Sequence, residues 1–286
     1  MNQQVIITTD SAADLPQGIR EEYGIPFIPL YIALGERAGR DSVDIFPMDV
    51  YKAYTAQGIY PKTSAPSIGD FEAFFRQYTE QGRAVVHISI GAAYSSSAQA
   101  ARMAALAMPE SEIHVVDSGM FTTAQGTLCV RAARLRDEGL SAEEIAARAE
   151  EIKGRVRAHI YLDKLDMVAR GGRVPALAAL GANLLQIHPS VILEGGNPLK
   201  MGKKYRGKSA QAQRAWLEDA VAALRDAIDP ALVFFLHTPE MPPETVEALA
   251  GAARALLPAR LEMAPLGCTC LVHSGFNCVG LAAAGK

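Results

Sequence analysis

The 286-residue chain lacks several features that would place it in common classes of protein. No stretch approaches the roughly 20 consecutive apolar residues that a membrane-spanning helix requires, so we expect no stable membrane insertion. The first residues, Met1 to Val5, carry no basic segment, and we expect no secretion signal. No Lys/Arg-rich tail is present and the formal net charge is −3, which gives no reason to expect nucleic acid as a partner. With only four cysteines, the chain is expected to be cytoplasmic with reduced thiols.

The local signatures of a serine nucleophile are also missing. Neither a G-x-S-x-G elbow nor an S-x-x-K pair occurs. Catalytic triads are recognised by geometry and not by order along the chain, so Ser95, His273 and Asp10 remain a candidate set. An enzyme acting on a small acyl or anionic substrate, either a hydrolase or a phosphotransferase, is therefore the alternative function.

One segment matches a nucleotide-binding motif letter for letter. Gly202 to Ser209 fits G-x-x-x-x-G-K-[ST], and a helix is expected after it. A phosphate-cradling loop needs converging amides, which favours small residues between the glycines, whereas here the interior is Lys-Lys-Tyr-Arg. We instead interpret the segment as a basic surface for an acidic partner, centred on Lys203, Lys204 and Arg206. An ordinary solvated loop is the remaining interpretation.

A group of thiols near the C-terminus raises the question of a metal site. Cys268, Cys270, His273 and Cys278 lie close together in sequence. The C-x-C spacing is tighter than that of common zinc knuckles, and residues 270–273 alternate as a strand would, which places Cys270 and His273 on opposite faces. We therefore expect buried cysteines, no metal and no cofactor.

The order of apolar runs predicts an α/β protein with two lobes. Short buried strands alternate with helices, as in Val5 to Thr9, Ala84 to Ile90 and the Ala-rich helix that starts near Ser95. That order favours mainly parallel sheets flanked by helices. We expect an N-terminal α/β domain over 1–156 and a C-terminal one over 157–286. The end of the chain is expected to form two short strands around a turn at 274–277.

Two hydroxyl-rich loops are the strongest indication of function. Lys62-Thr63-Ser64-Ala65-Pro66-Ser67 is one, and Tyr94-Ser95-Ser96-Ser97 is the other. Neither loop contains a His or Asp that could activate these hydroxyls, so neutral donors gathered without a base favour holding an anion. For Thr63 and Ser64 the structural alternative is a turn, and for Ser96 it is a helix cap. A free helix N-terminus would itself favour an anion.

Taken together, these segments resemble those of the DegV family. Motifs in the same order span almost the whole chain: Thr9 to Leu15, Lys62 to Ser67, Ile88 to Gln99, Gly171 to Val174, Asn183 to Pro189, Lys204 to Gly207, and His273 to Gly275. The resemblance implies a two-domain protein that is not itself an enzyme. It would enclose one long-chain fatty acid in a buried tunnel and present the carboxylate to a separate fatty acid kinase, which makes an acyl phosphate for phospholipid synthesis.

The resemblance also implies roles for individual residues. Thr63 and Ser95 would hydrogen-bond the carboxylate, with Ser64, Ser96 and His273 beside them. Arg206, with Lys203 and Lys204 nearby, would face the kinase. Two segments depart from the family pattern: His273-Ser274-Gly275 continues into Phe276-Asn277-Cys278, and Ser97-Ala98 follows the second hydroxyl loop. Candidate tail-lining groups are the Phe71-Phe74-Phe75 face and the Leu177-Leu180-Leu184 stripe, whose alternative role is ordinary core.

Overall fold

The computed structural model describes residues 4–173, 186–226 and 228–285. The helices in chain order are the short 3-10 turn η1 (Ser11–Ala13), then α1 (Gln17–Tyr23), α2 (Pro47–Gln57), α3 (Ile68–Thr79), α4 (Ser97–Leu106), α5 (Thr122–Asp137), α6 (Ala142–Lys153), α7 (Asp166–Gly171), α9 (Ser209–Leu224), α10 (Pro243–Leu256) and α11 (Cys268–Ser274). The strands are β1 (Val5–Asp10), β2 (Phe27–Ile28), β3 (Tyr31–Leu34), β4 (Arg37–Arg40), β5 (Lys62–Ser64), β6 (Ala84–Ser89), β7 (Ile113–Asp117), β8 (Val156–Tyr161), β9 (Ile187–Glu194), β10 (Lys200–Arg206), β11 (Ile228–His237), β12 (Leu261–Pro265) and β13 (Val279–Gly285).

The first sheet is parallel and has the order β2-β1-β6-β7. Helices α3 and α4 cover one of its faces, where Phe71, Phe74 and Phe75 pack against Val85. Ser67 is the N-cap of α3: its hydroxyl accepts from the amide of Asp70, and the Asp70 carboxylate accepts from the amide of Ser67. The apolar run at 25–34 divides into β2, at the edge of this sheet, and β3, in the small antiparallel sheet β4-β3-β5.

The second sheet has the order β10-β9-β8-β13-β11-β12 and is mixed. Only β11 and β12 run parallel, while the other neighbouring strands are antiparallel. The α/β class is confirmed, but the expectation of mainly parallel pairing holds only for the first sheet. A tight turn through Gly195 and Gly196 joins β9 to β10, and such short connections produce antiparallel neighbours. The sequence favoured a loop at 202–206, because these residues lack the alternating apolar pattern of a strand. They instead form part of the exposed edge strand β10.

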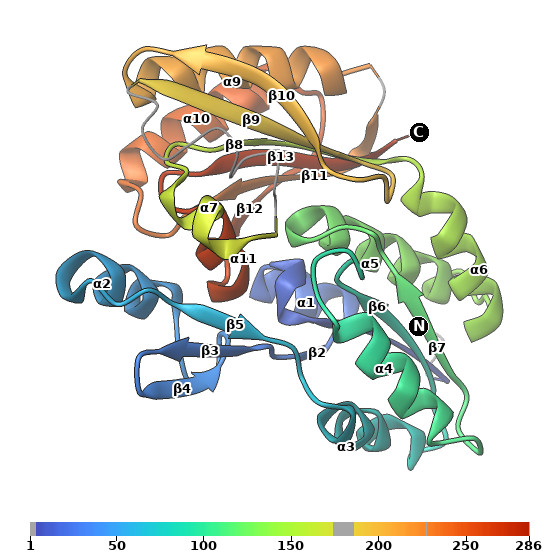
Figure 1. The fold of residues 1–286 in the computed structure, drawn as a ribbon. Coiled ribbons are helices and arrows are strands. Elements are labelled where there is room, and N and C mark those ends of the chain that lie inside the picture. Colours follow the sequence, from blue (N-terminus) through green and yellow to red (C-terminus); the bar gives the residue numbers. More distant parts are fainter. Residues whose placement is uncertain (1–3, 174–185, 227, 286) are drawn as a thin grey trace.

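The two larger sheets and their helices form stacked layers (Figure 1). Helices α9 and α10 cover one face of the second sheet, and α5 and α6 lie between the two sheets. Strand β11 shows how both faces are filled: Val233 and Phe235 pack toward α9 and α10, whereas Phe234 and Leu236 join the core between the sheets. One apolar core therefore continues from the first sheet through α5 to the second sheet.

The C-terminal segment differs from the prediction. Residues 268–274 form the helix α11 and not a strand, and β13 follows after the turn. Although α11 is near the end of the chain, it lies on the side of the second sheet that faces the N-terminal elements (Figure 1). A helix of seven residues is too short to be stable alone, so distant groups must hold its first turn.

The expected domain boundary lies at the start of the second sheet. The expected division after residue 156 falls at the first residue of β8, and the core between the sheets contains residues from both sides of it. The division remains a prediction.

Within the described parts of the chain, no helix combines the length and apolar character needed to cross a membrane.

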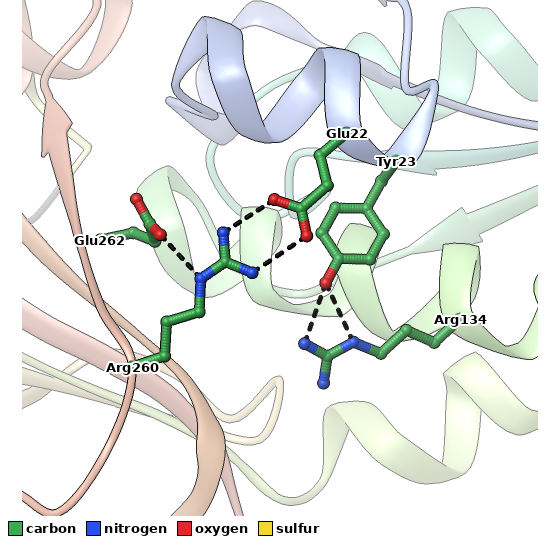
Figure 2. A network of polar contacts seen from close by, with 5 residues as sticks. All are labelled: Glu22, Tyr23, Arg134, Arg260 and Glu262. Atoms are coloured by element: carbon green, nitrogen blue, oxygen red, sulfur yellow. Dashed lines mark hydrogen bonds and ion pairs between the residues drawn. The ribbon is translucent and has the colours of Figure 1, made fainter.

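A polar network joins the two halves of the chain at the surface (Figure 2). Arg260, just before β12, donates to both carboxylate oxygens of Glu22 on α1, at 2.9 and 2.7 Å, and to Glu262 at 2.7 Å. Beside it, Arg134 on α5 donates to the hydroxyl of Tyr23 at 3.0 Å. The side chain of Arg260 is 43% exposed, so solvent screens these ion pairs.

We predict that Arg260→Ala lowers the free energy of unfolding by about 0.5–1 kcal/mol, because it removes the link to α1. Urea denaturation at low and high ionic strength measures this, and the loss should shrink at high salt. Arg254→Ala is the control, since Arg254 pairs with Glu247 inside α10. Equal losses in the two variants would contradict a specific contribution from the link between the halves.

Candidate functional site

A cavity of about 320 Å³ lies between the two sheets. Its volume is within the range of small-ligand pockets, about 300–1,000 Å³. The apolar wall comes from both halves of the chain and includes Leu30, Ile90, Ile160, Leu162, Val191 and Leu236. Along β8, Ile160 faces the cavity while Tyr161 points to the opposite core, as strand alternation requires. An apolar chain is the ligand that such a wall suits.

Hydroxyl groups occupy part of the cavity lining. Thr63 and Ser64 come from β5, and Ser95 and Ser96 from the loop before α4, so the structure brings the two hydroxyl loops to one cavity. Ser95 Oγ accepts from the amide of Ser97 at 3.2 Å. The Ser96 side chain makes no capping bond, which leaves its hydroxyl free of the cap role that we considered. Binding of a ligand by these residues remains a prediction.

His273, on the last turn of α11, meets the first hydroxyl loop. Its Nε2 lies 3.0 Å from Thr63 Oγ1, and it also lines the cavity. Burial, aided by the charge of Arg173, lowers the pKa of His273 from 6.5 to about 4, so the ring is neutral at pH 7. The other nitrogen, Nδ1, is buried and has no hydrogen-bond partner among the described residues. It lies against Gly171, where an added Cβ would come within 2.6 Å of it, so only glycine fits there.

Two carboxylates from the N-terminal half hold the start of α11. Asp41 accepts from the amides of Cys268 and Thr269, each at 3.0 Å, and from the hydroxyl of Thr269 at 2.7 Å. Asp14 accepts from the amide of Gly267 at 2.9 Å. Three amides of the first turn are thus satisfied by distant side chains, which replaces a local N-cap. Burial raises the pKa of Asp14 to about 7.

The cavity also contains residues to which we assigned no role from the sequence. Arg173 lines it and donates from Nη1 to the carbonyl of Gly171 at 2.9 Å. Tyr94 and Phe121 meet edge to face, with ring centroids 4.9 Å apart. Thr122 has φ +52°, a strained value for a β-branched residue, and donates to Asp14 at 2.7 Å. The Gly171-Gly172-Arg173 motif was the available indication for Arg173.

The candidate triad is not assembled among the described residues. Asp10 accepts from the amide of Ile90, the hydroxyl of Ser89 and the amide group of Gln125, and its pKa is raised to about 6 by burial. His273 pairs with Thr63 instead. No group of three or more potential metal-ligating side chains gathers in the part of the chain that the structure describes. Cys268 and Cys270 donate to backbone carbonyls of Ile45 and Ala12.

The nucleotide-loop interpretation of 202–209 is wrong, because Gly202 to Arg206 lie in β10 and pair with β9. Lys203 is also less available than expected: it contacts Asp219 at 2.7 Å and lies over the Tyr205 ring. Lys204 and Arg206 are exposed and make no ion pair within the described residues. They alternate with the buried Tyr205, so they project from the face of the second sheet that carries the cavity.

Comparisons with known proteins agree with this architecture. The family model described as "Uncharacterised protein, DegV family" matches residues 4–286. The chain belongs to the DegV family. A DegV domain-containing protein of Streptomyces coelicolor is 31% identical over 284 residues, covering 98% of each chain. The resemblance inferred from the motifs is therefore confirmed.

Solved structures of DegV proteins share the fold. A DegV family protein of Thermus thermophilus, described by its fatty acid binding, is 27% identical, with a TM-score of 0.86 over 99% of this chain and 100% of that chain. A fatty acid (stearic acid)-binding protein of Eubacterium ventriosum is 25% identical, with a TM-score of 0.86 over 98% of each chain. Fatty acid binding thus occurs among DegV proteins.

The departures from the DegV pattern have structural consequences. Phe276 is buried and contacts Tyr51 of α2 edge to face, with ring centroids 5.0 Å apart. The turn after α11 therefore packs against α2. Ser97 and Ala98 are buried in α4 and do not line the cavity.

Of the candidate tail-lining groups, Phe71, Phe74 and Phe75 belong to the core under α3 and do not line the cavity, which is the alternative role of ordinary core. Leu177, Leu180 and Leu184 lie outside the described residues.

We predict a pH effect from His273. Its folded-state pKa, about 4, is below the unfolded value of 6.5, so its contribution to stability is present above pH 6.5 and is lost as the pH falls through about 4. His273→Gln retains an amide near Thr63 but cannot titrate, and should show about 1–2 kcal/mol less loss of unfolding free energy over this interval.

Urea unfolding of both proteins at several pH values gives the difference, which cancels contributions of other groups such as His87, whose pKa burial lowers to about 3. Parallel curves for the two proteins would show that His273 does not resist protonation in the folded state.

Proposed function

We propose that this DegV protein binds a long-chain fatty acid in the cavity between its sheets and presents the carboxylate to a separate fatty acid kinase. The observation that carries the proposal is the arrangement of the cavity, in which both hydroxyl loops and His273 border a largely apolar space. Fatty acid binding by solved family members supports it.

Affinity comes mainly from the buried tail. About fourteen methylenes at ~0.8 kcal/mol each give on the order of 11 kcal/mol before the costs of ordering the ligand. The head group then needs only satisfied hydrogen bonds, because an unpaired carboxylate would be costly to bury. Neutral hydroxyls meet that requirement.

His273 orients the hydroxyl of Thr63. Since no acceptor lies near Nδ1 among the described residues, a hydrogen there would be an unpaired donor, and Nε2 carries the proton instead. Nε2–H then donates to Thr63 Oγ1, which leaves the Thr63 hydroxyl hydrogen free for the fatty acid carboxylate. Ser95 accepts from the amide of Ser97, so its own hydrogen is likewise available.

Arg173 adds a positive charge to the lining. The neutral hydroxyls still supply the proposed direct contacts. A guanidinium at this position offsets the carboxylate charge and, after phosphoryl transfer, the larger charge of an acyl phosphate.

The phosphoryl donor and the catalytic groups belong to the partner. In this proposal the chain has no catalytic base of its own and acts in the cytoplasm as a carrier subunit for phospholipid synthesis. Lys204 and Arg206, on the cavity-side face of the edge strand β10, offer positive charge to an acidic surface of the kinase. Lys203 contributes less, because Asp219 already neutralises it.

The first test removes the two head-group hydroxyls. We predict that Thr63→Ala combined with Ser95→Ala lowers the fraction of protein carrying a fatty acid by about tenfold, because the carboxylate loses two hydrogen bonds. Native mass spectrometry measures the occupancy, and circular dichroism checks folding. Thr55→Ala, an exposed threonine of α2, is the control.

Unchanged lipid occupancy in the folded double variant would remove Thr63 and Ser95 from the head-group role. A wild-type protein that purifies without lipid and hydrolyses esters or ATP by itself would favour the alternative, an enzyme acting on a small acyl or anionic substrate.

The second test concerns the partner surface. We predict that Lys204→Ala with Arg206→Ala slows kinase-dependent phosphorylation of the bound fatty acid by about tenfold at low salt, while lipid occupancy stays unchanged. Lys200→Ala is the matched control, since Lys200 lies on the same strand but pairs with Glu194. Equal rates for the double variant and the control would place the kinase elsewhere.

A further inference from the structure

His188 on β9 is held between two oxygen acceptors. Its Nδ1 lies 3.0 Å from both the carbonyl oxygen and Oδ1 of Asp163, and its Nε2 lies 3.0 Å from the carbonyl oxygen of Gly207. The ring stacks on Tyr161, with centroids 5.5 Å apart and planes 27° apart. The side chain of His188 is 11% exposed and that of Asp163 is 7% exposed, so both polar groups are largely shielded from water.

This geometry determines the charge of the ring. A neutral imidazole has one N–H, and its second nitrogen would present a lone pair to an oxygen lone pair at 3.0 Å. Only the imidazolium donates to Asp163 and Gly207 together. The Asp163 carboxylate balances the charge and also accepts from the hydroxyl of Tyr161 and the side-chain amide of Asn277.

Groups from each neighbouring element are compatible with that ion pair. Tyr161 on β8 and Tyr205 on β10 are neutral because burial raises the pKa of each phenol above its ordinary value. Glu240 is engaged by the hydroxyl of Thr238 and the amide of Asn277. Arg206 and Lys208 flank Gly207 but are exposed to solvent. The carboxylate nearest to the ring is therefore that of Asp163.

The second acceptor belongs to the turn that ends β10. Gly207 has φ +108°, a conformation that favours glycine, and its amide donates to the carbonyl of Gln186 at 3.0 Å. The bond from His188 fixes the next peptide unit, between Gly207 and Lys208, through its carbonyl oxygen. Arg206 and Lys208 are the residues on either side of Gly207, and both side chains are exposed.

We propose that His188, as an imidazolium paired with Asp163, is a positioning residue that holds the Arg206-Gly207-Lys208 turn for the partner protein. The inference rests on the partner surface described under Proposed function. Protonated His188 keeps the Gly207 carbonyl turned inward and Arg206 outward. Loss of the proton breaks one of the two bonds and frees the turn.

The decisive variant is His188→Phe, which retains a ring against Tyr161 but makes neither hydrogen bond. We expect kinase-dependent phosphorylation to fall about tenfold, with lipid occupancy unchanged. His114→Phe is the control, because His114 is a partly exposed histidine of β7.

Two results separate this inference from the partner surface itself. If the Lys204/Arg206 variant slows phosphorylation but His188→Phe does not, the positioning role is wrong and the surface stands. If neither variant changes the rate, the surface is wrong, and the measurement on the isolated protein then decides the charge of His188.

Nitrogen NMR of the wild-type protein supplies that measurement without the kinase. The inference requires both ring nitrogens of His188 to carry hydrogen at neutral pH and the Gly207 amide to exchange slowly. A neutral His188 ring at pH 7 would overturn the proposal even if His188→Phe failed to fold.

Discussion

The site depends on the attachment of α11 to the N-terminal half of the chain. Asp14 and Asp41 accept from the amides of residues 267, 268 and 269, and these bonds place His273 beside Thr63. A helix of seven residues is not stable from its helix propensity alone. The two carboxylates therefore both stabilise α11 and set its direction. Burial of these acids has a cost, seen in the raised pKa of Asp14, which the amide and hydroxyl donors offset only in part.

A consequence of this attachment is that neither half completes the cavity alone. Leu30 and Ile90 come from the N-terminal half, whereas Ile160, Val191 and Leu236 come from the second sheet. The same strands send alternate residues such as Tyr161 and Phe235 into the core beneath α9 and α10. Stability of the second sheet and the shape of the cavity wall are therefore set by opposite faces of the same strands, so one face can change while the other keeps the sheet folded.

Residue type and local order were enough to predict part of this arrangement. The alternation of strands and helices is a local feature, and it was correctly predicted. Helix α11 was missed because a carboxylate distant in sequence stabilises its first turn. Strand β10 was missed because it is rich in lysine, which an edge strand tolerates. Leu162 and Leu236 line the cavity, yet their sequence pattern is that of ordinary core, and only tertiary packing distinguishes the two.

In the proposed function, the distribution of charge lets the molecule serve a lipid and a protein at different places. The hydroxyl-lined end of the cavity contains His273, which is neutral at pH 7, and the fatty acid carboxylate would lie there. Lys204 and Arg206, which make no ion pair within the described residues, lie on the edge strand of the sheet that forms the cavity wall, outside the lining itself. Between these regions lies Asp163, one residue after Leu162 of the wall and bonded to His188 behind the basic turn.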